Sequence, residues 1–289
     1  MIHLRPGRAD ELRRQMRRLT YDPLAVVGFA ILGAIILVSV FAQWLTPYAN
    51  QVGAFTDFSH AYLSPSLVHP FGTDNIGKDV LTQVLFGFRI SLFVAVVVLA
   101  VSAPPGIILG LVVGYYGGWV ETVLVRVIDI FLSLPGLVLA LVIAGVLGPS
   151  LNDVILAIIA IWWTWYARVM YTVTKQLKNQ PYVEAAKVQG AGSLRIMFFE
   201  ILPNATSTLA VKATLDFGFI ILIQSGMGFL GLGARPPTPD LGIMVASGMS
   251  FAATAWWIPF FPALALSLLI GSFNLIGNGL RDLFDVKVL

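Results

Sequence analysis

Long apolar runs dominate this sequence and constrain the fold more than any other feature. The first, Leu24 to Leu45, contains no charged residue and reaches the ~20 residues that a helix needs to cross the hydrocarbon core of a bilayer. A secretory signal would have a shorter apolar region followed by a small-residue cleavage site, so we expect an uncleaved membrane anchor. Similar runs follow at about 90–115, 119–147, 151–173, 209–232 and 256–276.

The composition agrees with a chain embedded in lipid. Hydrophobic residues make up 57% and charged residues 11%, whereas soluble proteins average about 25% charged residues. No segment outside the apolar runs is long enough to bury a core of its own. We therefore predict an all-α integral membrane protein with six transmembrane helices in a single membrane domain, residues 24–289.

The distribution of positive charge predicts the orientation in the membrane. The segment 1–23 contains Arg5, Arg8, Arg13, Arg14, Arg17 and Arg18, which indicates a cytoplasmic flank by the positive-inside rule. Leu12, Met16 and Leu19 also recur at helical spacing, so a surface helix on the membrane lipid is an alternative. With six spans, both termini are cytoplasmic, the loop 46–88 lies outside and the loop 174–208 lies inside. Because the basic residues follow topology in this way, we do not expect a nucleic acid to bind.

The sequence provides no set of residues for catalysis or metal binding. It contains no cysteine, which excludes thiolate metal sites and a cysteine nucleophile. Its three histidines, His3, His60 and His69, form no catalytic or metal-binding pattern. A nickel-handling role for His60 and His69, which share the outer loop with Asp74, stays open as an alternative. We predict that the chain is not an enzyme and binds no cofactor or metal.

A polar motif in the outer loop precedes the second span. Residues 71–80 read Phe-Gly-Thr-Asp-Asn-Ile-Gly-Lys-Asp-Val and resemble a phosphate-binding Walker A loop from Gly72 to Lys78. However, Asp79 replaces the Ser or Thr that would bind magnesium, and no strand precedes the loop. We expect instead that Thr73 or Asp74 caps an amphipathic helix.

Charges and prolines also occur within the predicted spans. Arg126 and Asp129 are three residues apart and so share a helix face, which predicts an intramembrane ion pair. Arg168 is expected to extend its charged end to the inner surface of the membrane. Pro104 and Pro105 lack the amide hydrogen, so we expect a kink in the second span.

The predicted inner loop contains two short helices. Asn179 is expected to cap a helix that begins at Pro181 and stops at Gly190 and Gly192, and Ser193 to cap a second one that ends before Pro203. Small residues, Ala185, Ala186 and Gly190, allow close approach by a partner. On these grounds alone the loop is either a docking surface or a mere connection between two spans.

A family resemblance favours docking. Glu184-Ala185-Ala186, Gly190 and Leu202-Pro203-Asn204 resemble the cytoplasmic signature loop of binding-protein-dependent ABC importer permeases, with Glu200 where that family has isoleucine. Three other stretches are similar to the second, C-type permease of dipeptide, oligopeptide and nickel importers. They are the outer-loop motif with Phe71, Gly72, Thr73, Asp74, Gly77 and Asp79, the segment 228–233 with 236–239, and the segment 274–282.

The resemblance implies the type I ABC importer permease fold, with a coupling helix between spans four and five. It implies half of a translocation pore in the inner membrane, completed by a homologous second permease. Two cytoplasmic ATP-binding subunits would hold ATP and Mg²⁺ and bind the coupling loop, and an extracytoplasmic solute-binding protein would deliver short peptides. Alternatives are import of nickel or another small solute, and an ion-coupled secondary transporter that uses Asp129 and Asp216.

Overall fold

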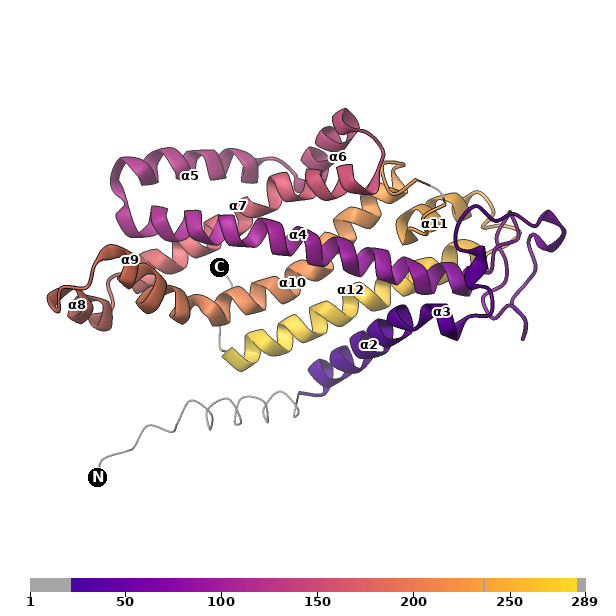
Figure 1. Cartoon of the computed structure of the whole chain (residues 1–289), viewed down its shortest axis with the longest axis horizontal. Coiled ribbons are helices and arrows are strands. Elements are labelled where there is room, and N and C mark those ends of the chain that lie inside the picture. Colours follow the sequence, from indigo (N-terminus) through magenta and orange to yellow (C-terminus); the bar gives the residue numbers. More distant parts are fainter. Residues whose placement is uncertain (1–21, 236, 285–289) are drawn as a thin grey trace, which may run out of the picture.

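The computed structural model describes residues 22–235 and 237–284, and in these residues it is a bundle of helices (Figure 1). The predicted basic segment 1–23 lies outside the described residues except for its last two. The α-helices are α2 (Pro23–Val40), α3 (Ala42–Leu45), α4 (Val80–Tyr116), α5 (Gly118–Ser133), α6 (Gly136–Leu147), α7 (Leu151–Leu177), α8 (Pro181–Val188), α9 (Ser193–Arg195), α10 (Leu202–Phe229), α11 (Leu241–Met249) and α12 (Trp257–Phe284). Two 3₁₀ turns, η1 (Ala49–Gln51) and η2 (Phe58–His60), and a π-helical turn, η3 (Ile196–Ile201), complete the elements.

Five helical segments are long and apolar enough to cross a membrane, and a bent pair can form a sixth span. The five are Pro23–Val40, Val80–Tyr116, Leu151–Leu177, Ser193–Phe229 and Trp257–Phe284. The described residues contain no strand, only an isolated bridge between Thr73 and Asp79. The prediction of an all-α membrane protein is therefore confirmed.

The third predicted span, 119–147, is not one continuous helix. α5 and α6 meet at a break and are bent by 88° relative to each other. Leu134 is extended, with φ −91° and ψ 139°, and Pro135 follows it. A residue before proline is pushed out of the helical region by the proline ring, so this dipeptide ends α5.

Three other prolines do not end helices. α4 continues through Pro104 and Pro105, and it begins at Val80, earlier than the predicted 90. The helix expected to stop before Pro203 instead runs through the π-helical turn η3 into α10, where Pro203 lies in the first turn. The proline is tolerated there because it directly follows the π-helical turn, where the amide of Leu202 already bonds to the carbonyl of Met197 and the regular α-helical hydrogen-bonding pattern is interrupted.

The helix pair α4 and α7 forms the most extensive contact in the bundle. Gly106, Gly110 and Gly114 lie four residues apart and face α7. A Cβ atom at Gly106 or Gly110 would lie only 2.3 Å from the carbonyl oxygen of Trp163 or Ala167. Small residues thus allow the two backbones to approach closely, as in many membrane helix pairs.

The remaining long helices complete the bundle and define its two ends. α12 packs against both α10 and α2. The short helices α8 and α9 lie at one end of the bundle, and the segment 46–79 with α11 lies at the other (Figure 1). These two ends hold most of the candidate functional residues.

Candidate coupling site and outer cap

Helix α8 and its flanking turns form the first candidate site. The helix begins with Pro181 in its first turn, as predicted, but its N-cap is Gln180 rather than Asn179 and no side chain caps it. At the other end the amide of Gly190 donates to the carbonyl of Lys187 at 2.9 Å, and the amide of Ala191 donates to Ala186 at 3.0 Å. Gly190 has φ +79°, a conformation that favours glycine, so this residue ends the helix.

One apolar side chain anchors α8 to the bundle. Val183 is 0% exposed and is the only buried residue of this helix. It belongs to a small hydrophobic cluster at this end of the bundle, together with Leu111, Met170, Ile196, Met197, Ile201 and Ala205. The cluster packs α8 against η3 and includes residues of α4 and α7, while the rest of the helix faces outward.

The predicted docking residues lie on the outward side. Glu184, Ala185 and Gly190 are exposed, and Ala186 is half-buried. No hydrogen bond or ion pair within the described residues uses the Glu184 carboxylate, and a Cβ at Gly190 would meet nothing within 4 Å. Val188 is 89% exposed. This surface contributes little to the fold of the chain itself and is open to a partner.

The other signature residues lie at the start of α10 and have different roles. Leu202 is half-buried and packs on the cluster beneath α8, whereas Pro203 and Asn204 are exposed. The amide nitrogen of the Asn204 side chain donates to the carbonyl of Glu200 at 2.6 Å. Glu200, the departure from the family pattern, borders an open groove of about 840 Å³ lined also by Leu194, Arg195, Phe198 and Phe199.

A charged cluster that we did not predict from the sequence joins α4, α5 and α7 at the end of the bundle that carries α8. Lys175 Nζ lies 2.8 Å from Oε1 of Glu121, and the Tyr171 hydroxyl donates to the same carboxylate. Lys178 Nζ donates to the carbonyl of Gly114 at 3.0 Å. These partners are separated by fifty positions or more, so no local pattern could have indicated them.

The predicted ion pair between Arg126 and Asp129 is wrong. Oδ1 of Asp129 lies 3.1 Å from Nη1 of Arg168, which comes from α7. Arg126 is exposed, and no carboxylate of the described residues lies within 4.0 Å of it. A shared helix face permits a contact, but here the neighbouring helix provides the partner.

Another ion pair, this one largely buried, lies within α10. Lys212 Nζ lies 2.8 Å from Oδ1 of Asp216, four residues along the helix, and both side chains are largely buried. The ammonium also lies 5.5 Å from the ring centre of Trp165 and 5.3 Å from that of Tyr166. Asp216 is therefore neutralised next to α7.

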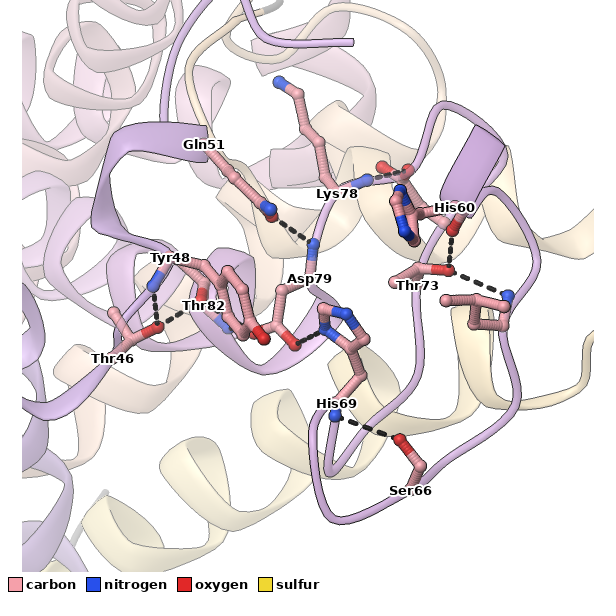
Figure 2. A network of polar contacts seen from close by, with 12 residues as sticks. Thr46, Tyr48, Gln51, His60, Ser66, His69, Thr73, Lys78, Asp79 and Thr82 are labelled. Atoms are coloured by element: carbon pink, nitrogen blue, oxygen red, sulfur yellow. Dashed lines mark hydrogen bonds and ion pairs between the residues drawn. The ribbon is translucent and has the colours of Figure 1, made fainter. Parts of the chain in front are cut away.

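The outer-loop motif folds into a compact cap at the opposite end (Figure 2). Asp79 is 1% exposed, and its carboxylate accepts hydrogen bonds from Nδ1 of His69 at 3.0 Å and from the amide of Thr82 at 2.8 Å. Its own amide donates to the side chain of Gln51 at 2.7 Å. The helix cap of α4 is thus Asp79, and the expectation that Thr73 or Asp74 caps a helix is wrong.

Thr73 and Asp74 instead hold the loop on itself. The Thr73 hydroxyl donates to the carbonyl of His60 at 2.6 Å, and the Trp257 indole donates to the carbonyl of Thr73 at 3.1 Å. Asp74 accepts from the amides of Ile76 and Lys78 at 2.9 and 2.8 Å. Burial raises the pKa of Asp74 and lowers the pKa of Lys78.

The remaining residues of the motif contribute packing and tight turns to the same cap. Phe71 stacks on Phe261 with ring centres 4.0 Å apart. Gly72 and Gly77 have φ values of +72° and +82°, and a Cβ at Gly77 would lie 1.9 Å from the carbonyl oxygen of Asp57. The motif residues therefore connect the outer loop to the first turn of α4 and to α12.

Within the cap, the side chains considered for nucleotide or nickel binding contact other groups of the chain. Lys78 Nζ donates to the carbonyl of Gly53 at 2.7 Å, so this ammonium is used within the chain. His60 pairs with Asp57 and His69 with Asp79, at 2.7 and 3.0 Å. Among the described residues, no group of three His, Cys, Asp or Glu side chains is positioned to hold a metal ion.

Comparisons with known proteins agree with this architecture. Residues 106–289 match the family described as binding-protein-dependent transport system inner membrane component, and residues 12–65 match the N-terminal TM domain of oligopeptide transport permease C. The chain is 38% identical to the dipeptide transport system permease protein DppC of Alkalihalophilus pseudofirmus, over 96% of this chain and 90% of the relative. It is 42% identical to DppC of Escherichia coli, over 91% and 89% respectively. It is 37% identical to the di/tripeptide transport system permease protein DppC of Pseudomonas aeruginosa, over 96% and 92%.

The helical bundle, with an exposed helix α8 between two spans, is that of a multi-pass membrane protein. The chain belongs to the binding-protein-dependent transport system inner membrane components, and within them to the C-type peptide ABC permeases. The family predicted from the signature loop and the outer-loop motif is thereby confirmed.

Proposed function

We propose that this chain forms half of the translocation pathway of an ATP-driven importer of short peptides. A homologous second permease completes the pathway. Two ATP-binding subunits, which hold ATP and Mg²⁺, dock on the exposed side of α8, and an extracytoplasmic binding protein delivers the peptide to the outer cap. The relatives named as dipeptide and di/tripeptide permeases support this substrate class.

The observation that carries the proposal is the division of α8 into an anchored and an exposed side. Val183 binds the helix to the bundle, whereas Glu184, Ala185 and Val188 extend away from it. A helix held in this way transmits a push from a docked subunit to α4 and α7 through the cluster beneath it. Coupling of this kind requires two packings of the bundle that ATP favours differently.

The proposed orientation places α8 in the cytoplasm. Lys175, Lys178, Lys187 and Arg195 surround α8, and the positive-inside rule assigns such a loop to the cytoplasmic side. The outer cap, at the opposite end of the bundle, then faces the binding protein. Both termini lie on the cytoplasmic side in this arrangement.

The proposal is tested by peptide uptake into membrane vesicles that contain this chain and its four partner proteins. We expect uptake of a labelled dipeptide that requires ATP and stops when any one subunit is omitted. Glu184→Arg should leave membrane insertion intact and abolish uptake, since it reverses the charge of the docking surface. Glu184→Asp, which keeps the charge at the same position, is the matched control and should retain uptake.

The alternative functions give different results in the same uptake assay. Uptake by this chain alone, abolished by an uncoupler and indifferent to ATP, would show an ion-coupled transporter instead. The acids that such a transporter would use, Asp129 and Asp216, are both paired with basic side chains, which counts against that mechanism. Uptake of nickel but of no peptide would show that the substrate is nickel and not a short peptide.

A further inference from the structure

Helix α5 presents three different faces. Its packed face contacts α7 and α4 and includes Ile128, the one buried residue of the helix. A second face is apolar and exposed, with Val123, Val127 and Ile130, the last being 63% exposed. Polar residues recur at intervals of four, three and four positions on the third face, which Thr122, Arg126, Asp129 and Ser133 form. Residues at these intervals lie above one another along a helix.

The apolar and polar exposed faces require different surroundings. Val127 and Ile130 suit lipid, but a charged guanidinium in the hydrocarbon core is costly and normally faces water or a polar partner. Arg126 is exposed and has no carboxylate within 4.0 Å among the described residues. The third face of α5 therefore does not face lipid.

The polar surface continues onto the neighbouring helix. Arg168 of α7 reaches Asp129 at 3.1 Å, and both side chains remain exposed, by 43% and 44%. Thr172 lies four residues further along α7 and is half-exposed. We call these six residues the polar strip: Thr122, Arg126, Asp129, Ser133, Arg168 and Thr172.

The polar strip extends deep into the membrane. Asp129 lies eleven positions after Gly118, the first residue of α5. At a rise of about 1.5 Å per residue this is about 16 Å, or roughly half of the hydrocarbon thickness. The strip is thus too long to be a feature of the membrane surface alone.

We propose that the polar strip lines the aqueous pathway through which the peptide passes. This inference rests on the proposed permease function and adds which residues of this chain meet the substrate. A short peptide carries a positive and a negative end, and the strip offers both signs of charge. Arg126 faces the carboxylate groups of the peptide, while the paired Asp129 and Arg168 provide hydrogen-bonding groups with no net charge.

The chain contains no cysteine, so single cysteines can be placed without background. In the complete transporter in nanodiscs, a charged, water-soluble thiol reagent should label Thr122→Cys, Ser133→Cys and Thr172→Cys. It should label the controls Val127→Cys and Ile130→Cys on the apolar face at least about tenfold more slowly, since a charged reagent does not enter the hydrocarbon core. A lipid-soluble maleimide should label these controls.

Two results would overturn the inference. Strip cysteines that react only with the lipid-soluble maleimide would face lipid, and strip cysteines that react with neither reagent would lie against the second permease. Peptide uptake by the transporter without a cysteine substitution is measured in parallel. If ATP-dependent uptake is present and the strip is unreactive, only this inference fails, whereas absent uptake contradicts the proposed function itself.

A charge test at Arg126 separates contact with the substrate from a structural role. Arg126→Glu should lower the uptake of dipeptides with an acidic side chain several-fold relative to neutral dipeptides, and Arg126→Lys should restore the ratio. An equal loss for acidic dipeptides, neutral dipeptides and neutral dipeptide amides, which lack a carboxylate, would show that Arg126 does not meet the substrate.

Discussion

Nη1 of Arg168 lies 3.1 Å from Oδ1 of Asp129, and this contact joins the middle of α7 to α5. The pair joins two helices that are separated in the sequence by the break at Pro135 and the whole of α6. It replaces the pair with Arg126 that helical spacing predicted, and it leaves Arg126 exposed to its surroundings.

A double-mutant cycle should detect the Arg168–Asp129 pair. We expect a coupling energy of about 0.2–1 kcal/mol between Arg168→Gln and Asp129→Asn, because the two side chains are partly exposed. The same cycle with Arg126→Gln and Asp129→Asn should give a value near zero. Unfolding in bicelles measures both cycles, and a larger coupling for Arg126 would contradict the observed pairing.

Val183→Ala should loosen helix α8. The change removes two buried methyl groups, so we expect it to weaken the packing of α8 on the bundle by about 1–3 kcal/mol. Val188→Ala, on the same helix but 89% exposed, should change it little. Hydrogen exchange of the α8 amides measures the difference, and equal protection in the two variants would exclude Val183 as the anchor.

Gly110→Ala should separate α4 from α7. The added methyl group would meet the Ala167 carbonyl oxygen at 2.3 Å, and overpacking of this kind costs about 1–3 kcal/mol. Gly145→Ala in α6 has nothing within 4 Å and is the control. The midpoint of thermal unfolding in detergent should fall for the first variant alone.

Asp74 should make the outer cap more stable in acid than at neutral pH. Burial raises its pKa above the ordinary 3.8, so the folded cap binds a proton more readily than the unfolded loop does. Its contribution to stability is therefore most favourable below pH 3.8 and declines as the pH rises through the folded pKa. Asp74→Asn should remove this dependence, as measured by limited proteolysis of the loop across acidic pH.

Asp57 provides the comparison with the opposite sign. Hydrogen bonds from Ser59 and His60 lower the pKa of this exposed carboxyl group, so its favourable contribution is present above pH 3.8 and is lost as the pH falls through the folded pKa. Asp57→Asn should therefore remove a loss of stability in acid. If the pH dependence of stability changed in the same direction in both variants, the raised pKa of Asp74 would be contradicted.

Much of the candidate site could be predicted because its signals are local. The apolar run from Leu24 to Leu45, the proline at position 181 and the glycine at position 190 each act on their own stretch of chain. The motif from Phe71 to Asp79 could be singled out, but its helix cap was assigned to the wrong residue. Thr73, Asp74 and Asp79 are all good capping residues, and which one caps depends on where α4 begins.

The sequence by itself determined the membrane class, the approximate spans and the residues of α8 that we propose for docking, since hydropathy and backbone preference depend on neighbouring residues. Only the tertiary structure decided that Asp129 pairs with Arg168, that Val183 anchors α8 and that Gly106, Gly110 and Gly114 face α7. These contacts join residues far apart in the chain, and they form only when the helices are packed at a particular rotation and depth.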